Sequence, residues 1–276
     1  MSDLKKELKT AQNAVREAGK ILRASYGRLE RDDVTEKREN DMVTVVDFAS
    51  QEKIVAMIRK EFANDYILAE ESPDKDINEG VSMGSRRWII DPLDGTTNYI
   101  HAYPMFAVNI ALEVDGRVDL GVTYDPMRDE LFSAVRGGGA HLNGRPIHVS
   151  GIEAKNRTLL ATGFPFRARQ YLDDYLKTFR YFFNNARGLR RGGSAALDIA
   201  YVAVGRVDAF WEATLSPWDM AAGIVLVEEA GGRVTDFFRG TDSLTNGHIV
   251  ATNGRFHDWM CDEIEKVFPK GTVFEG

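Results

Sequence analysis

The sequence predicts an α+β fold in which helices and mixed or antiparallel sheets are stacked as a layered sandwich. Three observations lead to this prediction. Helical patterns open and close the chain, short apolar runs typical of buried strands lie between them, and residues 105–149 alternate between apolar and polar side chains around turn signals. Each helix and sheet of this kind has an apolar face, and stacking them in layers buries those faces.

The composition is that of an acidic globular protein. The 276 residues, 43% of them hydrophobic, suffice for one large domain or two smaller lobes. The 42 acidic and 35 basic residues give a net charge of -7, whereas a duplex-binding domain usually has the opposite sign. The single cysteine, Cys261, excludes an internal disulfide and a cysteine-based zinc site, and we expect a cytoplasmic protein. Because no apolar run approaches membrane-spanning length, we expect no membrane partner.

The first hundred residues predict two long helices and two strands. Residues 4–22 place apolar side chains at the three-and-four spacing of an amphipathic helix, and a second such pattern begins near Asp47. The apolar runs 66–69 and 87–90 predict buried strands, and each ends in acidic residues. Residues 96–100 can begin a further short helix directly after a glycine.

Residues 105–149 predict an antiparallel meander. Turn signals stand at Asp115-Gly116, near Pro126 and at Asn143-Gly144, and apolar residues alternate between them.

The rest of the chain is predicted to contain both helices and strands. In order, the patterns predict a strand at 158–163, a helix at 169–183, a helix and a strand within 192–212, a helix at 218–232, strands at 233–237 and 248–253, and a helix at 255–267.

Five acidic residues stand where apolar runs end or helices begin: Asp47, Glu70, Asp91, Asp94 and Asp219. Taken singly, Asp47 and Asp219 are predicted to be helix N-caps, and Glu70 could equally belong to an exposed loop. The pair Asp91 and Asp94 needs a different explanation, because a second carboxylate after a buried strand is costly without a compensating partner.

A cluster of divalent cations would compensate these charges. Carboxylates that converge without histidine or cysteine form a hard oxygen site, which suits magnesium or manganese. Such cations can bind a phosphoryl group and activate a water. Gly95, Thr96 and Thr97 add backbone N–H groups and hydroxyls, which are typical phosphate ligands.

Three motifs then resemble one family. The DPLDGT stretch at 91–96 resembles the signature of the inositol monophosphatase family of magnesium-dependent, lithium-sensitive phosphatases. ILAEES upstream and WDMAAGIVLVEEAGG downstream resemble its two other acidic motifs, and the resemblance runs in order from about residue 4 to residue 267. It implies a layered αβαβα sandwich of the sugar-phosphatase type.

The resemblance also implies roles for individual residues. Two or three Mg²⁺ ions, for which Mn²⁺ could substitute, would be held by Glu70, Asp91, the Leu93 carbonyl, Asp94 and Asp219. Thr96, with Glu70, would orient the attacking water, and Asp47 would support the Thr96 hydroxyl. The implied substrate contacts are Asp94, Gly95, Thr96, Gly193, Ser194, Ala195, Glu212 and Asp219. Ser194 can also be a plain helix cap, and both roles can hold together.

A break in the apolar pattern near residue 150 suggests two lobes. The lobe 1–150 would carry the metal and phosphate motifs. The lobe 151–276 would carry the substrate loop and Asp219, and the two would form one compact catalytic unit.

The implied function is hydrolysis of myo-inositol monophosphates and similar polyol phosphates by a homodimeric phosphomonoesterase. Two alternatives stay open. Arg190 and Arg191 could bind a second phosphate, as in a phosphatase for fructose 1,6-bisphosphate or 3′,5′-bisphosphoadenosine, or they could be a solvated pair. Some members of the bacterial branch, which ATGFPFRARQY and the 124–144 stretch resemble, assist transcription antitermination. The chain could therefore be a partner of the transcription machinery with incidental hydrolysis.

Overall fold

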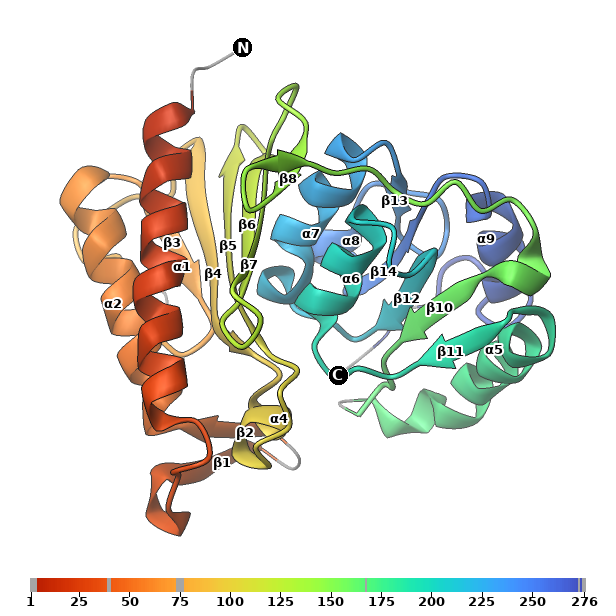
Figure 1. The fold of residues 1–276 in the computed structure, drawn as a ribbon, viewed down its shortest axis with the longest axis horizontal. Coiled ribbons are helices and arrows are strands. Elements are labelled where there is room, and N and C mark those ends of the chain that lie inside the picture. Colours follow the sequence, from red (N-terminus) through yellow and green to blue (C-terminus); the bar gives the residue numbers. More distant parts are fainter. Residues whose placement is uncertain (1–3, 39–40, 73–76, 167, 273, 275–276) are drawn as a thin grey trace.

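The computed structural model describes residues 4–38, 41–72, 77–166, 168–272 and 274. Two large sheets stand face to face, with one pair of helices between them and further helices on their outer faces (Figure 1). The predicted α+β fold, a layered αβαβα sandwich with mixed sheets, is confirmed. Within the described ranges, every helix is too short or too polar to traverse a lipid bilayer.

The first layer consists of α1 (Lys5–Ser25) and α2 (Val45–Glu61), which cover the outer face of a seven-stranded sheet (Figure 1). In this sheet β3 and β4 are parallel and the remaining neighbours are antiparallel. In spatial order its strands are β3 (Tyr66–Ala69), β4 (Arg86–Asp94), β5 (Ala107–Val114), β6 (Arg117–Asp125), β7 (Glu130–Val135), β8 (Ala140–Leu142) and β9 (Arg145–Pro146).

Strand β4 contributes apolar side chains to the cores on both faces of its sheet. Trp88 and Ile90 point into the apolar core shared with α1 and α2, whereas Ile89 points into the core on the opposite face. Successive side chains of a strand alternate between its faces, so a strand covered on both sides is apolar throughout. This explains why the run 87–90 contains consecutive apolar residues.

The inner helices α6 (Ala195–Ala203) and α7 (Pro217–Glu229) fill the space between the sheets. Beyond them lies a five-stranded mixed sheet, and α5 (Leu172–Asn185) and α9 (His257–Glu265) cover its far face. In spatial order its strands are β11 (Gly188–Arg190), β10 (Leu159–Thr162), β12 (Ala209–Ala213), β14 (His248–Thr252) and β13 (Arg233–Thr235).

Several short elements escaped the sequence patterns because they span too few residues to show a period. They are the hairpin of β1 (Val34–Arg38) and β2 (Asp41–Thr44), the strand β11, the helix α8 (Ser243–Asn246), and the 3₁₀ turns Arg31–Asp33 and Lys155–Arg157. The helix predicted at 169–183 begins as a 3₁₀ turn, Arg169–Tyr171, and continues as α5. The short helix predicted at 96–100 is α4 (Thr96–Ile100). The boundary predicted near 150 falls between β9 and β10, and the division into two lobes stays a prediction.

Two details of the prediction were wrong. Strand β4 does not end at residue 90 but continues, with an irregularity, to Asp94, where it still pairs with β5. Asp47 and Asp219 are not N-caps, because Thr44 and Ser216 hold those positions and the two acids stand at the third helical position of capping boxes. There each carboxylate accepts a hydrogen bond from the backbone of its cap residue.

Candidate active site

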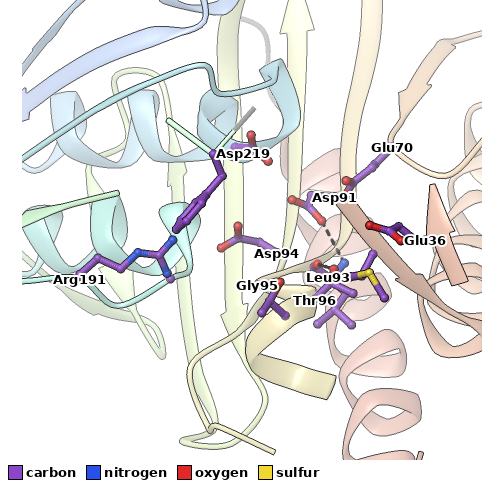
Figure 2. A pocket seen from close by; sticks show the side chains of 13 residues that line it. Glu36, Glu70, Asp91, Leu93, Asp94, Gly95, Thr96, Arg191 and Asp219 are labelled. Carbon is purple, nitrogen blue, oxygen red and sulfur yellow. Dashed lines mark hydrogen bonds between the residues drawn. The ribbon is translucent and has the colours of Figure 1, made fainter. Parts of the chain in front are cut away.

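A cavity of about 440 Å³ opens where β4 ends (Figure 2). Its lining residues are Glu36, Met42, Glu70, Asp91, Leu93, Asp94, Gly95, Thr96, Thr97, Phe166, Arg191, Gly193 and Asp219. A second cavity of about 180 Å³ adjoins it and shares Asp94, Arg191 and Asp219 with it. The two cavities therefore form one acidic depression between the sheets.

Three carboxylates converge in the larger cavity. Asp91 and Asp94 come from β4 and Asp219 from the first turn of α7, and one oxygen of each lies within 4.8 Å of the others. Their side chains point toward a common space (Figure 2), although the residues are only 1%, 8% and 8% exposed. Three like charges in a buried position are unfavourable without a counterion.

Burial and mutual repulsion raise the pKa values of two of these acids, Asp91 and Asp94. Burial raises the pKa of Asp91 well above its ordinary value, and the neighbouring charges of Glu70, Asp94 and Asp219 raise it further. Burial and the charge of Asp219 raise the pKa of Asp94 to about 7, although hydrogen bonds from Ser194 and the start of α6 oppose the shift. The fold thus holds these acids in a place that disfavours their ionised form until a cation compensates it.

The residues fit a hard divalent cation. Asp91 accepts a hydrogen bond from the Leu93 N–H through Oδ1, at 3.0 Å. Its Oδ2 is buried and has no hydrogen-bond partner among the described residues, as expected for an oxygen that binds an ion. The lining contains carboxylates, hydroxyls and backbone carbonyls but neither histidine nor cysteine, and this donor set suits Mg²⁺ or Mn²⁺ better than zinc or copper.

Gly95 makes the turn from the acidic strand into α4. Its φ is +90°, in the left-handed region that favours glycine. A Cβ there would lie 3.0 Å from the Met105 carbonyl oxygen and 3.2 Å from that of Gly193. Glycine is therefore required both by the backbone angle and by the close approach of two other segments.

The Thr96 hydroxyl is oriented by Asp47, a residue of α2. Its Oγ1 lies 3.2 Å from Asp47 Oδ1 and 3.0 Å from the Leu93 carbonyl oxygen, and it can donate its proton to either. Asp47 is fully buried, and its Oδ2 accepts from the backbone N–H and the hydroxyl of Thr44. The capping box of α2 therefore also fixes the acceptor of the Thr96 hydroxyl.

Asp94 connects the acidic strand to the inner helices. Its Oδ2 accepts hydrogen bonds from the Ser194 hydroxyl and from the Ala196 N–H, the latter at 3.0 Å. Ser194 is the N-cap of α6, as predicted for its structural role. The first turn of α6 is thus attached to the metal-binding strand, although about a hundred residues separate them in the chain.

The smaller cavity carries a second pair of acids. Glu212, at the end of β12, and Asp198, on α6, both line it together with Arg191. Burial raises the pKa of Glu212 well above its usual range, and Arg191 opposes that shift. Burial and the charge of Asp94 raise the pKa of Asp198 to about 8. This compartment offers carboxyl groups that can exchange hydrogen bonds with hydroxyls of a ligand.

The structure thus brings the predicted residues to one place. Glu70, Asp91, Leu93, Asp94, Gly95, Thr96, Gly193 and Asp219 line the larger cavity, Ser194, Ala195 and Glu212 line the smaller one, and Asp47 lies behind Thr96. Of the two arginines, Arg191 lines both cavities, whereas the Arg190 guanidinium bonds to the Leu189 carbonyl. A chelating arginine pair is therefore not formed here.

The cavities are also lined by four residues that were not predicted from the sequence, Glu36, Met42, Phe166 and Asp198. The first three stand on the β1–β2 hairpin and on the loop after β10, where no periodic pattern is available. Asp198 did leave a signal, since it lies four residues after Ser194 and so shares its helix face.

Gly163 gives room to the Glu212 carboxylate. A Cβ at position 163 would lie 1.9 to 2.1 Å from the Glu212 carboxylate atoms, so any side chain must displace them. Because the displaced group is the end of a flexible chain, we expect Gly163→Ala to cost little stability but to raise KM for a hydroxyl-bearing substrate about tenfold. Steady-state kinetics and thermal unfolding check this.

Gly151→Ala is the matched control, because a Cβ at position 151 meets nothing within 4 Å. It should leave KM unchanged. An unchanged KM in Gly163→Ala would show that the position of the Glu212 carboxylate does not matter for binding.

Similarities to known proteins extend over nearly the whole chain. The profile of the inositol monophosphatase family matches residues 3–268. The Nus factor SuhB of Pseudomonas aeruginosa is 48% identical over 265 residues, which cover 95% of this chain and 97% of the relative.

Solved structures agree in fold. The extragenic suppressor protein suhB from Bartonella henselae superposes with a TM-score of 0.86 at 38% identity, covering 96% of this chain and 98% of that one. An inositol monophosphatase from Anabaena gives a TM-score of 0.83 at 40% identity, with 98% and 99% covered. All candidate site residues, from Asp47 to Asp219, lie inside the matched region.

Proposed function

The chain belongs to the inositol monophosphatase family, and we propose on this premise that it hydrolyses myo-inositol monophosphates and similar polyol phosphates with Mg²⁺. Membership makes it a phosphatase of this superfamily. The observation that carries the finer proposal is the convergence of Asp91, Asp94 and Asp219, beside an Asp91 oxygen that has no hydrogen-bond partner among the described residues.

Five groups of the larger cavity would hold the cations. They are the carboxylates of Glu70, Asp91, Asp94 and Asp219 and the carbonyl of Leu93. When bound, the cations supply the positive charge that attracts the phosphate, activates a water and stabilises the leaving oxygen. Without them the acidic cavity would repel an anionic substrate.

The protein's own contribution is to position the attacking water. A Thr96 hydroxyl that donates to Asp47 keeps its oxygen lone pairs available to accept a hydrogen bond from the water, which orients it. Glu70, which lines the same cavity, would accept the one proton that the water loses as it attacks. As the water oxygen forms its bond to phosphorus, the bond to the inositol oxygen breaks, and that oxygen takes a proton from a second water. The hydroxide left from the second water regains a proton from Glu70, so no net charge remains on the protein. The reaction requires no covalent intermediate between the phosphoryl group and a residue of the enzyme.

The smaller cavity would receive the ring. Glu212 and Asp198 face it from β12 and α6, and Ser194 and Ala195 line its edge. Carboxyl groups on the wall of this cavity can bond to several adjacent hydroxyls, which an alkyl alcohol does not offer. This arrangement supports the phosphate ester of a polyol as the substrate, rather than the phosphate ester of a simple alcohol.

The proposal is tested with a panel of substrates at saturating Mg²⁺. We expect kcat/KM for inositol 1-phosphate to exceed that for fructose 1,6-bisphosphate and 3′,5′-bisphosphoadenosine by at least about tenfold, because Arg191 faces the cavities without Arg190. EDTA should abolish the reaction and excess Mg²⁺ should restore it. A clear preference for either bisphosphate would reject the assignment.

A second function is favoured by the relatives. The similarity to a Nus factor over 95% of this chain supports a role as a partner of the transcription machinery, alongside hydrolysis. A homodimer likewise remains a prediction that rests on the family resemblance.

A further inference from the structure

Asn98 joins two parts of the site that are far apart in the chain. It stands on α4, two residues after Thr96. Its Nδ2 lies 3.0 Å from the Gly192 carbonyl oxygen, 3.1 Å from that of Gly193 and 2.7 Å from that of Met105. A primary amide has two N–H groups, so it can donate to the 192–193 backbone and to Met105 at the same time.

The glycines at 192 and 193 permit this contact. Gly193 has a φ of +83°, and a Cβ there would lie 2.9 Å from Asn98 Nδ2 and 2.5 Å from an Arg191 guanidinium nitrogen. A Cβ at Gly192 would lie 2.8 Å from Asp198 Oδ1. The loop therefore passes between the Asn98 amide and the Asp198 carboxylate with no room for side chains.

Asp198 holds the opposite side of the same loop, because its carboxylate accepts a hydrogen bond from the Gly192 N–H. Downstream, Asp94 binds Ser194 and the Ala196 N–H. The loop is thus attached to α6 through Asp198 and, at its downstream end, to β4 through Asp94, whereas Asn98 connects its carbonyls to the helix that follows the phosphate turn.

We propose that Asn98 is a positioning residue that sets the spacing between the phosphate site at 94–96 and the ring-binding residues that follow Gly193. The inference rests on the proposed function and deepens it. Phosphate would be held by the Gly95–Thr96 turn and ring hydroxyls by the walls of the smaller cavity. A substrate bound in both compartments requires them at a constant separation, and the amide of Asn98 provides a link of this kind beside the one that Asp94 makes to Ser194 and Ala196.

The variant Asn98→Leu removes the donor and keeps the approximate size of the side chain. We expect KM for inositol 1-phosphate to rise about tenfold, since a displaced ring site weakens binding of the hydroxyls. For p-nitrophenyl phosphate, which has no ring hydroxyls, kcat/KM should change by less than about threefold. Equal losses for both substrates would overturn the proposal, and so would an unchanged KM for inositol 1-phosphate.

Asn185→Leu is the matched control. Asn185 also donates from its amide to a backbone carbonyl, that of Tyr181 at 2.8 Å, but it lies at the end of α5 and lines neither cavity. This variant should leave both activities unchanged.

Hydrogen exchange separates this inference from the proposed function. In Asn98→Leu the backbone amides of residues 192–196 should exchange at least about tenfold faster than in the wild type, and in Asn185→Leu they should not. The difference in exchange rate is expected even if the wild type does not hydrolyse inositol 1-phosphate. Lack of hydrolysis would reject only the proposed substrate and not the role of Asn98. Unchanged exchange at 192–196 would overturn the role of Asn98.

Discussion

Asp91→Asn should lower the turnover of inositol 1-phosphate at least about a hundredfold at a fixed Mg²⁺ concentration. Asp91 is the most buried of the three convergent acids, and its Oδ2 has no hydrogen-bond partner among the described residues. The asparagine retains an acceptor for the Leu93 N–H but replaces the free anionic oxygen by an amide nitrogen, which is a donor and cannot bind a cation. Initial rates over a range of Mg²⁺ concentrations measure the loss.

The same substitution should not destabilise the metal-free protein, because it removes one of several mutually repelling buried charges. Thermal unfolding in EDTA therefore distinguishes a lost ligand from a lost fold. Asp258→Asn, which makes the same change of charge at an exposed ion pair with Arg233, is the control and should retain full activity. Near-normal turnover of Asp91→Asn would refute the metal assignment. If that variant loses hydrolysis but retains an antitermination phenotype, the second function is independent of catalysis.

Magnesium should stabilise the protein much more at about pH 7.5 than at about pH 5. The pKa of Asp94 is raised from 3.8 to about 7, with burial as the largest cause and Asp219 as the next. A carboxyl with a raised folded-state pKa contributes stability that is fully present below pH 3.8 and is lost as the pH rises through about 7. For Asp94 this loss is about 4 kcal/mol in the absence of cations, at about 1.4 kcal/mol per unit.

A bound cation reverses the loss, because it requires the ionised carboxylates and compensates their repulsion. Melting temperatures measured with EDTA or with Mg²⁺ at each pH report the difference between the two states. A sodium chloride solution of equal ionic strength is the control for general screening. An equal shift at both pH values, or no shift at all, would contradict a cation site at these acids.

Much of the site could be predicted because its chemistry is concentrated in short segments. In WIIDPLDGTTN, a buried strand, two carboxylates, a proline and a glycine follow one another within eleven residues, and this local order already requires a counterion and a turn. The helices and the long strands were predictable for a similar reason, since each has an apolar period that its own residues display. Short elements such as β11 and α8 have no such period.

Where prediction failed, the deciding contacts lie between distant segments. Asp47 was assigned to a helix cap because an acid before an apolar pattern commonly is one. In the folded chain Thr44 takes that position, and the Asp47 carboxylate bonds to Thr44 and, as the family resemblance implied, to the Thr96 hydroxyl. Asn98 carried no chemical signal alone and Asp198 only its spacing from Ser194, and their common approach to the Gly192–Gly193 backbone gives them a role.

The sequence by itself determined which acids the molecule gathers, the kind of cation they suit and the layered fold that carries them. These follow from residue type and local order, because hydrophobic periodicity and ligand chemistry are properties of the chain. Tertiary structure alone decided how the phosphate turn is spaced from the ring compartment and why Gly163 and Gly193 must lack side chains. Those features depend on close contacts between residues from about 50 to about 100 positions apart, and no local pattern encodes such distances.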